Sequence, residues 1–137
     1  MSCKPNIYVT NTTETAVLAN GILPFTIITR RNPRGIDLNG NSVTIADCGS
    51  NYYLVNVNAT FTAPVAGDVV LNLQQNGVNV VGATGSETIT TATTEVRSIS
   101  FQATIRTFNN IALDTLTVVN SGVEATFSNI TLSVIKL

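Results

Sequence analysis

The sequence predicts one all-β domain, a β-sandwich or jelly roll of about eight to ten strands. Thr, Val, Asn and Ile dominate the 137 residues, and β-branched side chains favour strands because they are stiff and pack well on a pleated surface. Apolar and polar residues alternate with a period of two in several short segments. Turn dipeptides such as Asn-Gly separate these segments, and no helical period is present.

The N-terminal residues 1–21 are polar with few apolar points. We expect them to form an arm or docking segment ahead of a jelly-roll domain at residues 22–137. Such an arm would be mobile in the free protein and ordered on a partner. The alternative is that Ile7 to Thr10 forms the first strand of the sandwich. No repeat or Pro-rich linker divides the rest of the chain.

The next two segments predict a strand and a hairpin. Residues 23–29 (LPFTIIT) predict a strand, and Pro24 places it at an edge or at a strand start. Apolar residues then flank Asn39-Gly40, which indicates a short hairpin with a two-residue turn. These flanking residues are Ile36, Leu38, Val43 and Ile45.

The clearest strand signal runs over residues 52–62. Every second residue from Tyr53 to Phe61 is apolar and the residues between them are mostly polar, as in a half-buried strand. The next strand, residues 69–73, ends near Asn76-Gly77, the dipeptide that a type I′ turn requires. The chain returns through Val78, Val80 and Val81.

The C-terminal half predicts three further elements and one irregular segment. Residues 84–95 are small and polar, hence a loop or a ragged edge strand. Residues 96–108 form a strand with Ile99, Phe101, Ala103 and Ile105 inward, and residues 113–119 form another.

The last segment changes parity, since Phe127 and Ile130 cannot face one side without an extra residue between them. We therefore expect a bulge near Ser128-Asn129. Beyond it, Ile135 and Leu137 are apolar on the face opposite the core. A neighbouring subunit would cover that face, so Ile135 and Leu137 are our candidates for a trimer interface.

The charge content indicates the class of partner. Only 11% of the residues are charged, against roughly 25% in an ordinary soluble domain, which favours a surface covered by other chains. The net charge of −1 gives no reason to expect nucleic acid or membrane as a partner. The first residues lack the apolar run of a signal peptide, so we expect cytoplasmic synthesis.

The residue types exclude most catalytic chemistry. There is no His, which removes Ser-His, Cys-His and His-metal arrangements. Cys3 and Cys48 cannot build a zinc site by themselves, and in a reducing compartment we expect free thiols. Asp37 and Asp47 could bind Ca²⁺ together, but solvated turn carboxylates account for them better. We expect no enzyme, no cofactor and no metal.

Arg30, Arg31 and Arg34 are the one concentrated charge feature. Guanidinium groups pair with carboxylates and sulfates, so this cluster is our candidate for binding an acidic capsid patch or an anionic glycan. The alternative is a solvated turn that keeps a sheet edge from pairing. The two interpretations have equal weight.

From about Gly49 onward, three segments resemble the tumour-necrosis-factor (TNF)/C1q-like jelly roll. They are GSNYY followed by the alternating strand, GDVVLNL with NGVNVVGA, and FSNITLSVI near the C-terminus. The chain looks most like the bacterial and phage type, found in collagen-like spore-surface glycoproteins and in phage head-fibre or decoration proteins. The resemblance implies a homotrimer with a role in display or adhesion. No Gly-X-Y stalk precedes the domain, which weakens a spore-filament interpretation.

The expected function follows from these features together. We expect a structural virion protein, a trimeric phage head fibre or capsid decoration protein anchored to the capsid through its N-terminal region. It would lie on the virion surface after cytoplasmic synthesis. The alternative is a spore- or cell-surface adhesion module that binds glycans, such as those of a host surface, through exposed loops.

Overall fold

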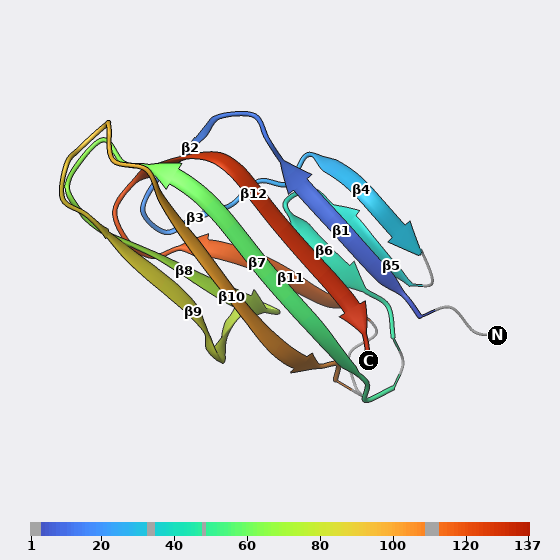
Figure 1. Ribbon diagram of the computed structural model, residues 1–137. Helices are drawn as coiled ribbons and strands as arrows, with labels where there is room; N and C mark the ends of the chain where they lie inside the picture. The colour runs from blue at the N-terminus through green and yellow to red at the C-terminus, as the bar shows by residue number, and fades with distance from the viewer. Residues whose placement is uncertain (1–3, 33–34, 48, 109–112) are drawn as a thin grey trace.

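The structure is a computed structural model that describes residues 4–32, 35–47, 49–108 and 113–137. These residues form an antiparallel β-sandwich of two sheets (Figure 1), which confirms the predicted all-β class. The strands number twelve rather than about eight to ten, because two of them are only two or three residues long. They are β1 (Asn6–Asn11), β2 (Thr15–Val17), β3 (Gly21–Ile22), β4 (Ile27–Asn32), β5 (Ile36–Asn39), β6 (Ser42–Ile45), β7 (Tyr52–Thr62), β8 (Gly67–Gln75), β9 (Val78–Ile89), β10 (Arg97–Arg106), β11 (Asp114–Asn120) and β12 (Ala125–Lys136).

Sheet A has the order β10-β7-β12-β1-β4, and β2 also pairs with β12. Sheet B has the order β5-β6-β11-β8-β9, and β3 also pairs with β11. In Figure 1 the long strands β7 and β12 run side by side through the middle of sheet A. The edge strands β9 and β10 lie on one side of the sandwich, and β4 and β5 lie on the other.

The core fills the space between the sheets, and period-two alternation supplies it. In β7 every second residue from Tyr53 to Phe61 is buried, as the sequence predicted. The rings of Phe61 and Phe127 pack with their centroids 5.5 Å apart and tilted by 56°. Alternation therefore fixes one buried and one outer face for each sheet.

The N-terminal segment differs from the expected arm. β1 lies between β12 and β4, and β2 pairs with β12 near Ala125. The side chains of Ile7 and Val9 are only 1% and 0% exposed. The segment from Asn6 to Val17 is thus part of sheet A, which is the alternative that the sequence left open. Its pattern was too short to stand out, because only two residues of β1 supply apolar core contacts.

Residues 23–26 also differ from the predicted strand. Leu23 and Phe25 are buried, but the chain here crosses from β3 in sheet B to β4 in sheet A. The amide of Leu23 donates to the carbonyl of Val118 (2.8 Å), and that of Thr26 donates to Thr10 (3.1 Å). Pro24 lacks the donor that a central strand needs, so regular pairing begins only at Ile27.

The predicted hairpin around Asn39-Gly40 is present, but Asn39 is the last residue of β5 and pairs with Ser42, so the turn itself is Gly40-Asn41. The other turns and irregularities follow the sequence closely. The register shifts between Phe127 and Asn129, which confirms the predicted bulge. Asn76 and Gly77 have φ values of 54° and 81°, as a type I′ turn requires. The polar stretch after Thr84 is an edge strand up to Ile89. Cys3, Cys48 and Arg34 lie outside the described residues.

Candidate functional site

The outer face of sheet A, turned away from sheet B, carries an unusual set of side chains. The cross-strand register places polar, uncharged residues over most of it. These described positions contain no carboxylate, and the only cation is Arg106 at one corner, with Arg30 beside them on the edge strand β4. The positions are Ser98, Ser100, Gln102, Thr104 and Arg106 of β10; Tyr52, Leu54, Asn56, Asn58, Thr60 and Thr62 of β7; Thr131, Ser133 and Ile135 of β12; and Asn6, Tyr8 and Thr10 of β1.

Cross-strand hydrogen bonds hold these polar side chains on the face. The hydroxyl of Ser100 donates to the Asn58 side-chain oxygen (2.6 Å), and the hydroxyls of Thr60 and Ser98 are 3.0 Å apart. Directly opposed polar pairs of this kind stabilise a sheet modestly. They also leave a surface that another chain can cover without burying a charge.

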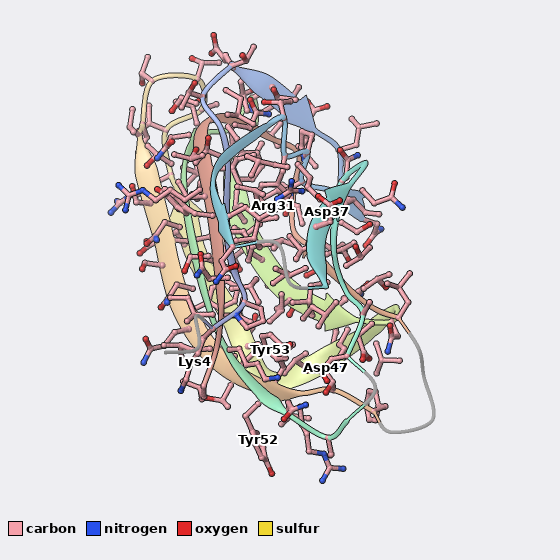
Figure 2. All side chains as sticks on the ribbon, turned by 90° about the vertical axis from the view of Figure 1, so that its right-hand side faces the viewer. Lys4, Arg31, Asp37, Asp47, Tyr52 and Tyr53 are labelled. Carbon is pink, nitrogen blue, oxygen red and sulfur yellow. The ribbon has the colours of Figure 1, made fainter. Side chains whose placement is uncertain are left out.

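Apolar residues gather at the end of this face where β7 begins and β12 ends. Leu54 pairs with Ile135, which is 42% exposed. The amide of Leu137 donates to the carbonyl of Tyr52 (2.9 Å), and these two side chains are 56% and 52% exposed. Figure 2 shows Tyr52 projecting from this end of the sandwich, whereas Tyr53 lies inside. Both candidate interface residues, Ile135 and Leu137, therefore lie in one exposed apolar patch.

A groove of about 290 Å³ opens on the same face, between β12, β1 and β4. Register partners connect its walls, since Arg30 pairs with Tyr8, Tyr8 with Ser133, and Ile135 with Asn6. Ile135 is thus shared by the apolar patch and the groove. The residues that line the groove are Asn6, Ile7, Tyr8, Arg30, Ser133 and Ile135.

Two arginines of the predicted cluster, Arg30 and Arg31, lie in different surroundings. Arg30 lines the groove, and none of the ion pairs among the described residues involves it. Arg31 forms an ion pair with Asp37 at 2.5 Å, so it links β4 of sheet A to β5 of sheet B (Figure 2). Arg30 and Arg31 are adjacent in the sequence, which suggested a single cluster. Neighbouring residues of a strand point to opposite sides, however, so the two side chains are separated.

Asp47 and Tyr53 form a hydrogen-bonded cluster at one end of the sandwich. Asp47 accepts hydrogen bonds from the Tyr53 hydroxyl (2.8 Å), the Asn51 amide group (2.8 Å) and the backbone of Gly49 (3.2 Å). The ammonium group of Lys136 lies 3.3 Å from Asp47. Figure 2 shows Asp47 and Tyr53 facing each other. The cluster ties the segment after β6 to β7 and β12.

The pKa values of this cluster shift away from neutrality. Burial raises the pKa of Asp47, but the hydrogen bonds from Tyr53 and Gly49 and the interaction with Lys136 outweigh it, so the pKa is lowered. Burial and the contact with Asp47 raise the pKa of Tyr53. A general acid or base works best with a pKa near the ambient pH. The cluster therefore suits a structural clamp.

Asp114 has a comparable structural place. Its carboxylate is fully buried and accepts hydrogen bonds from the side chains of Gln75 (3.2 Å) and Asn76 (2.8 Å). It thereby holds the β8–β9 turn against β11. In the part of the chain that the structure describes, no group of three or more His, Cys, Asp or Glu side chains could hold a metal ion. No helix among the described residues is long and apolar enough to cross a membrane.

Solved structures are similar to this chain in fold. Murine APRIL superimposes with a TM-score of 0.70 and 16% identity, covering 98% of this chain and 100% of that chain. The globular domain of zebrafish complement 1qA gives 0.65 and 8%, covering 94% of each chain. The PRD1 vertex protein P5 gives 0.60 and 12%, covering 100% of this chain and 99% of that one. No protein-family model matches the sequence, and no curated protein matches it.

These similarities establish the fold as a TNF/C1q-like jelly roll, which the sequence resemblance predicted. The three structures named are a mouse protein, a fish protein and a phage protein, and at 8–16% identity they share the architecture with this chain. The bacterial and phage type therefore stays a prediction.

Proposed function

We propose that this chain is a non-enzymatic structural module that assembles as a homotrimer through the outer face of sheet A. The mostly uncharged composition of that face, with no carboxylate at its described positions and Arg106 only at one corner, carries the proposal. Burying an unpaired charge is costly, whereas Asn, Ser and Thr side chains can hydrogen-bond across an interface. Folds of the TNF/C1q-like type typically form trimers, which supports the stoichiometry.

The apolar patch at one end of the face completes the proposed interface. Ile135, Leu137, Leu54 and Tyr52 supply the water-excluding contacts, and the hydroxyl and amide rows beyond them supply specificity. Contacts of both kinds are typical of protein interfaces, where an apolar centre is combined with polar surroundings.

In this proposal the trimer is displayed on a virion surface after cytoplasmic synthesis, as a head fibre or capsid decoration protein. The likeness to the PRD1 vertex protein P5 over nearly the full length of both chains supports a place on a viral particle. The capsid is then the scaffold partner, reached through the N-terminal region. Because β1 lies inside sheet A, the anchor consists of the residues before β1 and the neighbouring edge strand β4, where Ile27 and Ile28 are exposed.

A second candidate is an adhesion module on a spore or cell surface, with a glycan as its ligand. The exposed ring of Tyr52 beside its register partner Arg106 favours it, since aromatic rings and guanidinium groups both contact sugars or their acidic substituents. Mass spectrometry of purified virions and spores distinguishes the two. Detection of the chain in virions supports the first function, and detection only in spores supports the second.

The interface itself is tested by two isosteric substitutions. Asn58→Asp keeps the acceptor for Ser100 but buries a charge in the proposed interface. Asn72→Asp puts the same charge on β8 of sheet B, where Asn72 alternates with the buried Leu71 and Leu73 and so faces away from sheet A. We expect Asn58→Asp to raise the trimer dissociation constant at least about tenfold, and Asn72→Asp to change it less than about threefold. Equal effects would refute an interface on sheet A.

A further inference from the structure

A four-residue bulge in β9 forms an apolar protrusion at the edge of the molecule. Asn72 pairs with Thr84 and Gln74 with Asn79, so residues 80–83 have no partner in the register of β8. Val81 at the tip is 100% exposed, and Val78, three residues earlier in β9, is 69% exposed. In Figure 1 this bulge is the kink that projects from β9 away from the sandwich.

The bulge is anchored from inside. Ala83 is buried at 1% exposure and Val80 packs partly against the core, whereas Val81 and Gly82 point outward. Gly82 has a φ of 80°, a left-handed conformation that glycine adopts at low cost. Val81 is therefore held in place before any partner binds, which lowers the entropy cost of binding.

The groove on the outer face of sheet A lies at the same level along the strands as the bulge. Gly85 of β9 lies over Ile99 and Phe101 of β10, and Gln75 opposite Val78 bonds to Arg106. Val81 is therefore level with residues 102–104 of β10. From residues 102–104 of β10, the strand pairing of sheet A leads to Asn56 and Leu54 of β7 and then to Ser133 and Ile135 of β12. It continues to Tyr8 and Asn6 of β1. The residues reached on β12 and β1 make up most of the groove lining.

We propose that Val81 of one copy seats in the groove between β12, β1 and β4 of the next copy, and that this contact gives the trimer its direction. This inference rests on the proposed homotrimer. A protrusion and a groove on different parts of one chain make a head-to-tail contact, and such contacts close into a ring when the rotation allows it. Rotation about an axis parallel to the strands leaves the position of each residue along that axis unchanged. The bulge of one copy and the groove of the next therefore face each other only because they lie at the same position along the strands.

The chemistry of the two features is complementary. Val81 brings an apolar side chain, and the groove offers Ile135, which is 42% exposed. Residues 80–83 are displaced from the hydrogen-bonded ladder between β8 and β9, so their backbone N–H and C=O groups also need partners. The hydroxyls of Tyr8 and Ser133, the amide of Asn6 and the guanidinium of Arg30 supply donors and acceptors at the rim. The segment from Val78 to Ala83 carries no charge, so seating it leaves no buried charge from the bulge.

Two exposed valines provide a matched test. Val81→Asp places a charge in the groove of the next copy, and Val96→Asp places one before β10 at the other end of the sandwich. In light scattering over a concentration series, Val81→Asp should raise the trimer dissociation constant at least about tenfold, and Val96→Asp less than about threefold. Val81→Ile should assemble as the parent chain does. Equal behaviour of the two Asp variants would overturn the contact.

Disulfide trapping tests the direction of the contact. In a chain with Cys3→Ser and Cys48→Ser, the pair Val81→Cys and Ser133→Cys should form covalent trimers on oxidation, while either cysteine alone stays uncrosslinked. Crosslinking by a single cysteine would indicate a two-fold contact and overturn the inference. If the parent chain is trimeric but the double variant does not crosslink, the inference fails and the proposed function stands. A monomeric parent chain would refute the proposed function itself.

Discussion

Gly122, between β11 and β12, lies against the backbone of β8. A Cβ atom there would stand 2.1 Å from the Asp68 carbonyl oxygen and 2.7 Å from the Val70 nitrogen. Backbone atoms cannot rotate aside, so we expect Gly122→Ala to lower the free energy of unfolding by about 3 kcal/mol or more in urea titrations. Gly40→Ala is the control. Its added Cβ meets nothing within 4 Å, and its φ of 60° costs only about 1–2 kcal/mol. Equal losses would contradict the packing argument.

Glu95 holds the turn between β9 and β10. The hydrogen bond from Arg97, followed by those from Thr90 and Thr91, lowers its pKa to about 2 from an ordinary value of 4.5. A carboxylate whose pKa is lower in the folded chain stabilises the fold above its unfolded pKa. That contribution should decline as the pH falls from about 4.5 to about 2.

We therefore expect Glu95→Gln to flatten the decline of the melting temperature over this acidic window. Glu14→Gln, which removes an exposed carboxylate elsewhere on the surface, should leave the slope unchanged. Calorimetric scans at several acidic pH values measure both. An unchanged slope in Glu95→Gln would show that the turn does not depend on this charge.

Leu137 is the exposed end of the apolar patch in the proposed interface. We expect Leu137→Asp to weaken trimer assembly at least about tenfold, because it puts a charge into an apolar contact. The free energy of unfolding of the subunit should change by less than about 0.5 kcal/mol, as for other exposed positions. Val65→Asp, in the turn between β7 and β8, is the control. If Leu137→Asp assembles normally, Leu137 is a solvated end.

At the level of elements, β1 decides whether the N-terminal segment is separable. It pairs with both β12 and β4, and Ile7, Val9 and Val17 of this segment are buried. We expect deletion of residues 1–21 to leave β4 without a partner and to abolish cooperative unfolding. Circular dichroism during thermal unfolding measures this. If the truncated chain still melts cooperatively, residues 1–21 are a separable arm, and the fold does not depend on them.

The sequence could predict the elements whose signal is local. β7, the hairpin at Asn76-Gly77 and the short hairpin around Gly40 depend on alternation and turn residues that are contiguous in the chain. The bulge in β12 depends on a parity change between Phe127 and Ile130. β1 could not be recognised in this way. Two apolar residues become a central strand only because β12, more than a hundred residues later, lies beside them.

The candidate site was predictable to a similar extent. Ile135 and Leu137 could be assigned to the outer face, because parity requires no knowledge of other strands. The groove joins β1, β4 and β12, and the pairing of Arg31 with Asp37 joins the edges of the two sheets. Both arise from tertiary packing. The bulge around Val81 could not be predicted from the sequence, because the same apolar residues could belong to a regular alternating strand or to a segment displaced from the sheet.

For the molecule as a whole, the small number of charges has a structural meaning. None of the three ion pairs among the described residues involves the outer-face positions of sheet A. Arg31 with Asp37 and Arg97 with Glu95 lie at sheet edges or turns, and Lys136 with Asp47 lies at one end. The broad outer face of sheet A, which carries no carboxylate at its described positions and has Arg106 only at one corner, is the one that we expect a neighbouring subunit to cover.

The solution mass of the chain at micromolar concentration tests this central claim most directly. Size-exclusion chromatography with multi-angle light scattering should give three times the subunit mass of 14.5 kDa, with no change on dilution through the micromolar range. A stable species of 14.5 kDa, in which the outer face of sheet A would be exposed to water, would contradict the account.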